Sequence, residues 1–240
     1  MSSSDRTPAP AGKHTFYYSP GTCSLAPHIV LEEIGEPYEM MLISASGPRE
    51  GAATSTPTWR AINPKGRVPA LLGVPGRIGG ADNLLTEVPA IMAYLARTNP
   101  AAELLPSDPA AGARCIEWVS WLSCNLHSMA FAQMWRAHRF TTDEDGLVAV
   151  RNRGRENVSE CFAYIEKLLA DGRGWAIPEG YTIVDAYLLV FYYWGRCRIS
   201  LDMGTLCPAW TRLSEVVAAR PAVQRALKIE GITIFEAGGM

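Results

Sequence analysis

The stretch HTFYYSPGTCSLAPHIVLEEIG, residues 14–35, carries the pattern that decides the fold. Its first residues are rich in aromatic side chains and favour a β-strand. The SPGT that follows predicts a tight turn. Apolar residues then recur at near-helical spacing and a glycine ends the run: Leu25, Ile29, Val30, Ile34 and Gly35. The stretch predicts a strand, a turn and a helix, with a single cysteine, Cys23, at the start of the helix.

The segments that follow alternate between strand and helix patterns. They are PYEMMLIS (37–44) as a strand, TPTWRAI (56–62) as a short helix, VPALLGV (68–74) and NLLT (83–86) as strands, and EVPAIMAYLAR (87–97) as a helix. A proline lies in the first turn of that last helix, where a missing N–H costs little. The order β-α-β-α-β-β-α predicts a small α/β domain.

Strand patterns then stop, and long segments with helical periodicity predict an all-α bundle. Thr182 and Asp185 have the spacing of a capping box at the start of one of these helices. The stretch TNPAAELLPSDP (98–109) is rich in proline and small residues and predicts the linker. We therefore expect a flexible tail at residues 1–12, an α/β domain at 13–99 and an α-helical domain at 106–240.

Composition excludes several classes of function. The 240 residues are 48% hydrophobic and 19% charged, as expected for a folded globular protein, and the net charge is −2. The basic residues are scattered, which argues against nucleic acid as a partner. No apolar run approaches the ~18 residues of a membrane helix, and the N-terminus lacks the apolar core of a secretory signal. We expect a cytoplasmic protein, with no membrane partner.

The six cysteines form neither CxxC pairs nor a zinc pattern, so we expect reduced thiols and no metal site. Five of them lie in or near apolar helices and fit core positions: Cys115, Cys124, Cys161, Cys197 and Cys207. Cys23 has two interpretations. It is either a small buried hydrophobe or, because the N-terminus of a helix favours thiolate, a reactive group. A lone reactive thiol needs an external thiol as its partner, and glutathione fits that role.

Four motifs occur in a fixed order: SPGTCS, INPKGRVPAL, LLTEVPAIMAYLA and TIVDAYL. Together with the order of the elements they closely resemble the bacterial beta-class glutathione S-transferases, from residue 14 to about 232. The resemblance implies a thioredoxin-like N-terminal domain that binds glutathione, followed by an all-α domain. It also implies a homodimer.

The resemblance assigns roles to four residues around glutathione. Val68, the residue before Pro69, is expected to pair its backbone with the cysteinyl unit of glutathione, with Pro69 in the cis form. Glu87 matches the acidic residue that receives the γ-glutamyl end. Val88 replaces the serine that usually follows, but its N–H at a helix start can still hold a carboxylate. The alternative for Glu87 is a plain first-turn acid favoured by the helix dipole.

Three further residues are candidates on the same basis. His127 falls where relatives carry a histidine facing the reactive cysteine, although a histidine that fills a helix interface is an equal alternative. Ser19 is a hydroxyl that could donate to the glutathione sulfur if Cys23 does not. Arg49 is the residue that could replace a lysine of relatives in the loop 44–56. That loop and the segment 73–83 are both longer than in relatives.

These residues lead to a glutathione transferase that conjugates glutathione to a hydrophobic electrophile. Thiol–disulfide exchange through Cys23 is a close second activity. The alternative is a binding or regulatory protein of the same fold with little turnover, because fold alone does not prove activity. The expected wall for the electrophile consists of aromatic and methionine side chains, namely Tyr17, Trp121, Met129 and Tyr187.

Overall fold

The computed structural model describes residues 13–45, 53–76 and 81–235. Its sheet has four strands in the order β2-β1-β3-β4. They are β1 (Thr15–Tyr18), β2 (Glu39–Leu42), β3 (Ala70–Leu72) and β4 (Leu84–Thr86). β1 runs parallel to β2, whereas β3 is antiparallel to both β1 and β4. The predicted order of elements is confirmed.

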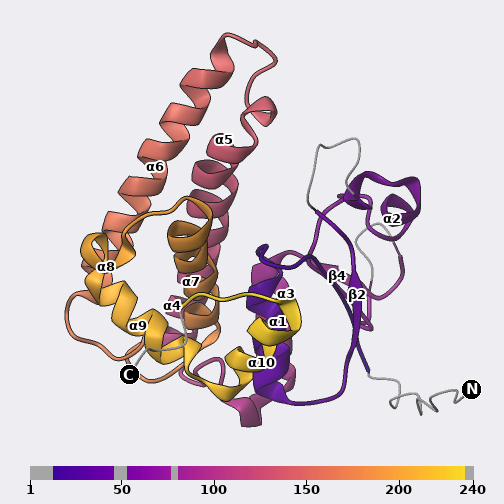
Figure 1. The fold of residues 1–240 in the computed structure, drawn as a ribbon. Helices are drawn as coiled ribbons and strands as arrows, with labels where there is room; N and C mark the ends of the chain where they lie inside the picture. The colour runs from indigo at the N-terminus through magenta and orange to yellow at the C-terminus, as the bar shows by residue number, and fades with distance from the viewer. Residues whose placement is uncertain (1–12, 46–52, 77–80, 236–240) are drawn as a thin grey trace, which may run out of the picture.

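Alternation along the strands gives the sheet two apolar faces. Phe16 and Leu71 point to the main core, while Tyr17 and Ala70 point to the opposite face and pack there with Trp59. The two faces are covered by α1 (Leu25–Ile34) with α3 (Val88–Thr98) and by α2 (Pro57–Ile62), which carries Trp59 (Figure 1). This is a thioredoxin-like domain.

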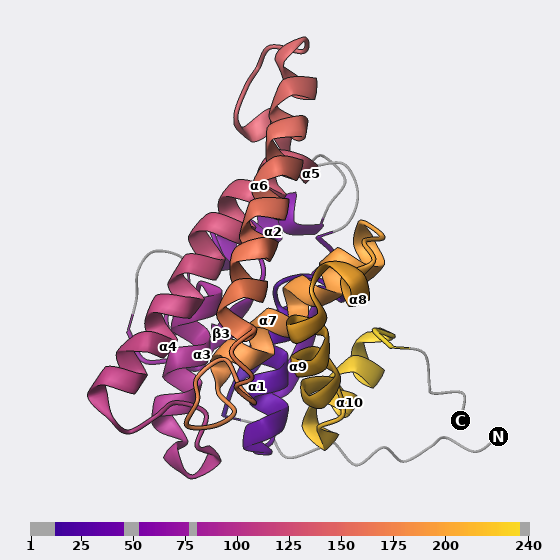
Figure 2. The same ribbon diagram turned by 90° about the vertical axis from the view of Figure 1, so that its left-hand side faces the viewer.

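The remaining helices form the all-α domain. They are α4 (Pro109–Trp121), η3 (Leu122–Phe131), α5 (Ala132–Trp135), α6 (Gly146–Leu169), α7 (Ile183–Tyr193), η5 (Trp194–Arg198), α8 (Met203–Leu206), α9 (Pro208–Ala218) and α10 (Pro221–Glu230). Short helical turns are η1 (Ala53–Ser55), η2 (Pro100–Ala102) and η4 (Ala137–Arg139). Every residue of α7 is buried, and this helix lies in the middle of the domain (Figure 2). Within the residues described, no helix is both long and apolar enough to cross a membrane.

The predicted capping box at the start of α7 is confirmed. The Thr182 hydroxyl accepts the N–H of Val184, and the Asp185 carboxylate accepts the N–H of Thr182 at 2.8 Å. Asp185 also accepts the N–H of Ala176 at 2.8 Å. This buried carboxylate therefore fixes both the start of α7 and the segment before it.

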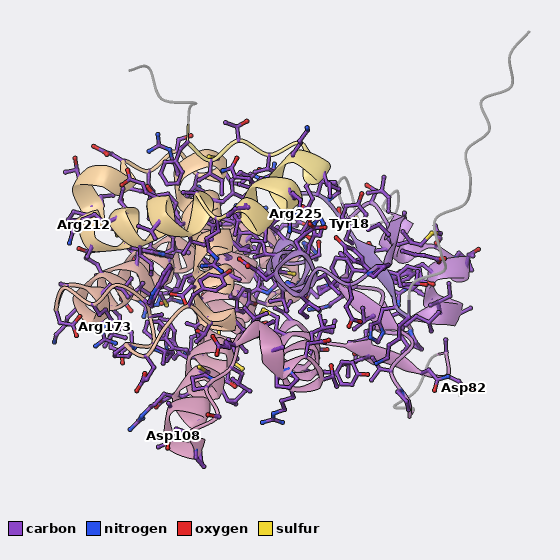
Figure 3. All side chains as sticks on the ribbon, turned by 90° about the horizontal axis from the view of Figure 1, so that it is seen from below. Tyr18, Asp82, Asp108, Arg173, Arg212 and Arg225 are labelled. Atoms are coloured by element: carbon purple, nitrogen blue, oxygen red, sulfur yellow. The ribbon has the colours of Figure 1, made fainter. Side chains whose placement is uncertain are left out.

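The two domains are docked through α1. It packs against α7 and α10 of the all-α domain. Two ion pairs flank this contact, Glu33 with Arg220 at 2.6 Å and Glu32 with Arg225 at 2.7 Å. Figure 3 shows the resulting arrangement from below, with Asp82 at the outer edge of the α/β domain and Arg212 on the far side of the helices. These contacts of α1 therefore hold the two domains together along one side of the surface between them.

Candidate functional site

A cavity of about 970 Å³ lies between the two domains. The α/β domain contributes the turn between β1 and α1 and the segment between α2 and β3. The all-α domain contributes η3, α5, η4 and η5. Three of the predicted site residues line this cavity together, namely Cys23, Val68 and His127. Residues more than 100 positions apart in the sequence are thus brought to one site.

The turn that carries Cys23 is held by the all-α domain. The N–H of Gly21 donates to Glu230 Oε2 and its carbonyl accepts from Trp194 Nε1, both at 2.9 Å. Gly21 has φ of 67°, and a Cβ there would lie 3.1 Å from the hydroxyl of Tyr193. Glycine is therefore needed at this position both for its backbone conformation and for the close approach of the neighbouring domain.

Cys23 is buried, and the expectation that it is an accessible, acidic thiol is wrong. It is 7% exposed, and its Sγ lies 3.7 Å from the carbonyl oxygen of Val68, to which it can donate. Burial raises the pKa of the Cys23 thiol to about 12, against the lowering effects of its own N–H and of Arg67. The helix-start effect is present, but the loss of solvent outweighs it because charge is costly in an apolar environment.

We predict that Cys23 in the free protein is alkylated slowly, at a rate that rises about tenfold with each pH unit and reaches no plateau below about pH 11. At about pH 8 a thiol with a pKa of about 12 is a thiolate in roughly one molecule in ten thousand. Iodoacetamide labelling with peptide mapping should find the exposed Cys124 and Cys197 first. Labelling of Cys23 as fast as Cys124 at neutral pH would contradict the buried, protonated state.

Val68 and Pro69 have the cis geometry that the resemblance implies. The Val68–Pro69 peptide bond is cis, and Val68 lines the cavity immediately before β3. The Asn63 side chain donates to the carbonyl of Arg67 at 2.8 Å and thereby holds the segment that leads into this bond. The Val68 peptide lies at a strand end facing the cavity, where an extended ligand can pair with it as an added strand.

Glu87 is the N-cap of α3, outside the first turn, and has φ of 74°. A positive φ is unusual for a glutamate and occurs often at ligand-binding positions. Its carboxylate is 2.6 Å from Lys65 Nζ, and the Glu87 side chain is 61% exposed. Neither Glu87 nor the buried Val88 lines the cavity directly, but Lys65 does. The carboxylate is therefore linked to the cavity through its ion pair with Lys65.

His127 lies on η3, where its ring packs 5.2 Å from Trp194 and 6.2 Å from Phe191. Burial, together with the charges of Arg67 and Arg139, lowers the pKa of His127 to about 4. The imidazole is consequently neutral at physiological pH. It can donate a hydrogen bond into the cavity, but it does not supply a positive charge to a neighbouring thiolate.

Two of the other predicted site residues take different positions. Ser19 is buried and does not line the cavity; its hydroxyl accepts the N–H of Ala45 at 3.1 Å. This contact holds the turn rather than the sulfur of a ligand, so the prediction of a catalytic Ser19 is not supported. Arg49 lies outside the described residues.

The predicted aromatic wall is wrong. Its four members do not line the cavity: Tyr17, Trp121, Met129 and Tyr187. The wall is instead formed by Phe131, Trp135 and Trp194, whose ring centroids lie 4.6–5.1 Å apart.

The wall lies in and beside two wide helical turns, η3 and η5. In η3 the N–H of Ala132 donates to the carbonyl of His127, and after η5 the N–H of Ile199 donates to that of Trp194. These are i→i+5 bonds, typical of π-helix, which is often found at functional sites. Within these two segments, the side chains that point inward differ from those that a spacing of 3.6 residues per turn predicts.

Arg67 is a site residue that the sequence analysis missed. It lines the cavity, and its charge lowers the pKa of both Cys23 and His127. Its place directly before Val68, within the motif INPKGRVPAL, is the signal that could have identified it. Any thiol bound beside these two residues would experience the same positive potential, which favours thiolate.

The chain is similar to known proteins over most of its length. A family profile described as "Glutathione S-transferase, N-terminal domain" matches residues 21–98. The chain is 33% identical to glutathione S-transferase GstA of Escherichia coli O157:H7 over 219 residues, which cover 90% of this chain and 98% of the relative. The chain belongs to the glutathione S-transferase family.

Solved structures of glutathione transferases agree with this fold. A Sulfitobacter glutathione transferase homologue with bound glutathione superposes with a TM-score of 0.79 at 30% identity, covering 92% of this chain and 99% of that one. A beta-class glutathione S-transferase of Sphingomonas chungbukensis gives 0.73 at 28% identity, covering 91% and 100%. The similarity therefore extends over both domains.

The chain departs from the family pattern in places that bear on the site. Val88 stands in place of the serine that follows the acidic residue, so only its N–H is left for a ligand carboxylate. Ser120, in place of an asparagine of relatives, is exposed on α4. Parts of the two longer loops, residues 46–52 and 77–80, lie outside the described residues.

Proposed function

We propose that this protein conjugates glutathione to an electrophile in the cavity between its domains. The observation that carries the proposal is that Cys23, Val68 and His127 line one cavity. A backbone strand end, a sulfur donor and a neutral imidazole around one cavity suit the peptide and the thiol of a single ligand. Each contributes a different contact, and none of them needs a metal ion.

In the proposed mode of binding, glutathione extends along the end of β3. Its cysteinyl unit pairs with the backbone of Val68, as an added strand would. Its γ-glutamyl ammonium approaches Glu87, and the α-carboxylate next to that ammonium lies at the start of α3, near the N–H of Val88. Lys65, 2.6 Å from Glu87, adds a cation for the same carboxylate.

The sulfur of glutathione then lies beside Cys23 and His127. Cys23 stays protonated, because burial raises its pKa to about 12, so it donates a hydrogen bond rather than attacking. The neutral His127 donates a second one. Arg67 supplies the positive potential that favours the thiolate. A protonated Cys23 also makes conjugation the main activity and thiol–disulfide exchange a minor one.

Glu87→Gln should weaken glutathione binding about tenfold, because it removes a charge-assisted contact with the ammonium group. Titration calorimetry measures this, with the melting temperature nearly unchanged. The matched control is Glu117→Gln, since Glu117 forms an exposed ion pair at the same 2.6 Å, but its partner Arg114 does not line the cavity, whereas the partner of Glu87, Lys65, does. Equal affinities for the two variants would remove Glu87 from the site.

The alternative is a binding protein without useful turnover, which Val88 in place of the family serine favours. Retention on glutathione-agarose combined with turnover of 1-chloro-2,4-dinitrobenzene separates the two functions. A transferase is retained and accelerates release of chloride. Retention on the resin without turnover of any electrophile or disulfide would show that the protein binds glutathione but does not act as an enzyme.

The assembly and location of the protein stay predictions. The homodimer follows from the resemblance to beta-class enzymes, and sedimentation analysis of the purified protein tests it. A mass of about one chain at micromolar concentration would contradict the homodimer. The cytoplasmic location rests on the sequence alone.

A further inference from the structure

The cavity concentrates positive charge in a chain whose net charge is −2. Six permanently charged side chains line it, and no carboxylate does among the described residues: Arg60, Lys65, Arg67, Arg136, Arg139 and Arg198. A cleft with one sign of charge focuses its field and attracts ligands of the opposite sign. The basic lining is therefore a local feature of this site and not a consequence of overall composition.

The cations come from both domains. Arg60, Lys65 and Arg67 belong to the α/β domain, where glutathione is proposed to bind, and its two carboxylates can be satisfied there. Arg136 and Arg198 come from the all-α domain, at the end of α5 and in η5. These two guanidinium groups, like that of Arg139 in η4, line the cavity from the all-α domain. Glutathione bound on the α/β side leaves this side for the second substrate.

Arg136 and Arg198 flank the aromatic wall. Arg136 follows Trp135, and Arg198 lies in the same wide helical turn as Trp194. The Nη2 of Arg198 is 3.2 Å from the point where a Cβ on Gly21 would lie, so it reaches the turn that carries Cys23. Neither guanidinium forms a hydrogen bond or ion pair with a described residue, although Arg198 lies over the ring of Tyr193 at 5.7 Å.

We infer that the second substrate is an aromatic electrophile that carries an acid group. Its ring would pack on Trp135 and Trp194, and its carboxylate or sulfonate would bind Arg136 and Arg198. This inference rests on the proposed function and adds an acid group to the hydrophobic electrophile that the sequence suggested. With an aryl chloride, the glutathione sulfur forms the C–S bond and the C–Cl bond breaks. Chloride leaves with the electron pair, and the thiol proton passes to solvent.

The test compares two aryl chlorides of the same shape, 4-chloro-3,5-dinitrobenzoate and 4-chloro-3,5-dinitrobenzamide. Each kcat/KM is divided by the uncatalysed rate constant with glutathione, which removes the difference in intrinsic reactivity. A charge-assisted contact predicts a preference of about tenfold to a hundredfold for the benzoate, decreasing as ionic strength rises. A ratio of one or below in the wild-type protein would overturn the inference.

Variants identify the groups responsible. Arg136→Gln and Arg198→Gln should each lower the benzoate-to-benzamide ratio about tenfold, with partial recovery in the lysine variants. Arg212→Gln is the matched control, because Arg212 is exposed on α9 on the far side of the helices (Figure 3). A ratio that neither cavity variant changes would place the acid group elsewhere and overturn the assignment.

A binding measurement separates this inference from the proposed activity. The glutathione conjugates of the two probes are added to the protein, and the quenching of tryptophan fluorescence gives their dissociation constants. If neither aryl chloride is turned over but the acidic conjugate binds about tenfold more tightly, the conjugation activity fails and the acid site stands. Equal binding of the two conjugates overturns the acid site whatever the turnover.

Discussion

Replacing Glu230 by alanine is expected to lower the free energy of unfolding by about 3–5 kcal/mol, because it breaks a buried pair and leaves its partners unsatisfied. The Glu230 carboxylate is 2.7 Å from His28 Nδ1, with both side chains fully buried, and it also accepts the N–H of Gly21. Urea unfolding measures the change. Glu230→Gln keeps an acceptor and should lose less, and the exposed Glu215→Ala should lose almost nothing.

The same substitution should also act on the site, since Glu230 holds the turn that carries Cys23. In Glu230→Ala the alkylation rate of Cys23 should rise more than that of Cys115 and Cys207, which are buried away from the turn. Those two cysteines report global unfolding. If all three rates rise by the same factor, Glu230 stabilises the fold but does not position the turn.

Arg67→Gln is expected to lower kcat/KM for conjugation about tenfold at pH 6.5 and to raise the apparent pKa of the pH profile by about one unit. The direction of this pKa change follows from the reactive form of glutathione, which is the thiolate. The thiolate is the basic form of the glutathione thiol, a nearby cation lowers its pKa, and removal of that cation raises it. Activity is therefore lost below the pKa and recovered at high pH.

A second measurement tests whether Arg67 acts through its charge. Arg67 lowers the pKa of His127, so Arg67→Gln should raise that pKa from its value of about 4, as NMR titration of the imidazole would show. Arg60→Gln is the comparison, because Arg60 lines the same cavity but does not act on Cys23 or His127. An unchanged pH profile in Arg67→Gln would exclude the electrostatic role.

The fold could be predicted because its signals are local. The strand, turn and helix of residues 14–35 depend on aromatic content, SPGT and apolar spacing, and the capping box at Thr182 and Asp185 depends on two side chains three residues apart. Each of these features is determined by neighbours in sequence, and the structure contains all of them. The cis bond before Pro69 was expected only from the resemblance to the family, and no local signal of the residues predicts it.

The properties of Cys23 could not be predicted because they depend on burial. The helix-start argument considers only the backbone N–H groups and the dipole, which favour thiolate. Whether the sulfur is solvated depends on Val68, 45 positions away, and on the packing of the second domain. Once the desolvation is known, it outweighs the dipole and reverses the direction of the pKa shift.

The aromatic wall of the cavity was mispredicted, and part of it, Phe131 and Trp194, lies in π-helical segments that the sequence pattern does not reveal. The sequence pattern assumes 3.6 residues per turn, and two π-helical segments, η3 and η5, break that period. Phe131 and Trp194 lie in these segments and line the cavity, whereas Met129, also in η3, does not. No feature of the residues themselves identifies a π-helical turn in advance.

The most direct test of the central claim is a crystal structure of the protein with glutathione. The account predicts that the peptide occupies the cavity, with its cysteinyl backbone paired to Val68 and its sulfur within about 4 Å of Cys23 Sγ, in contact with His127. Its ammonium group should lie at Glu87. Glutathione bound outside this cavity, or with its sulfur directed away from both Cys23 and His127, would contradict the account.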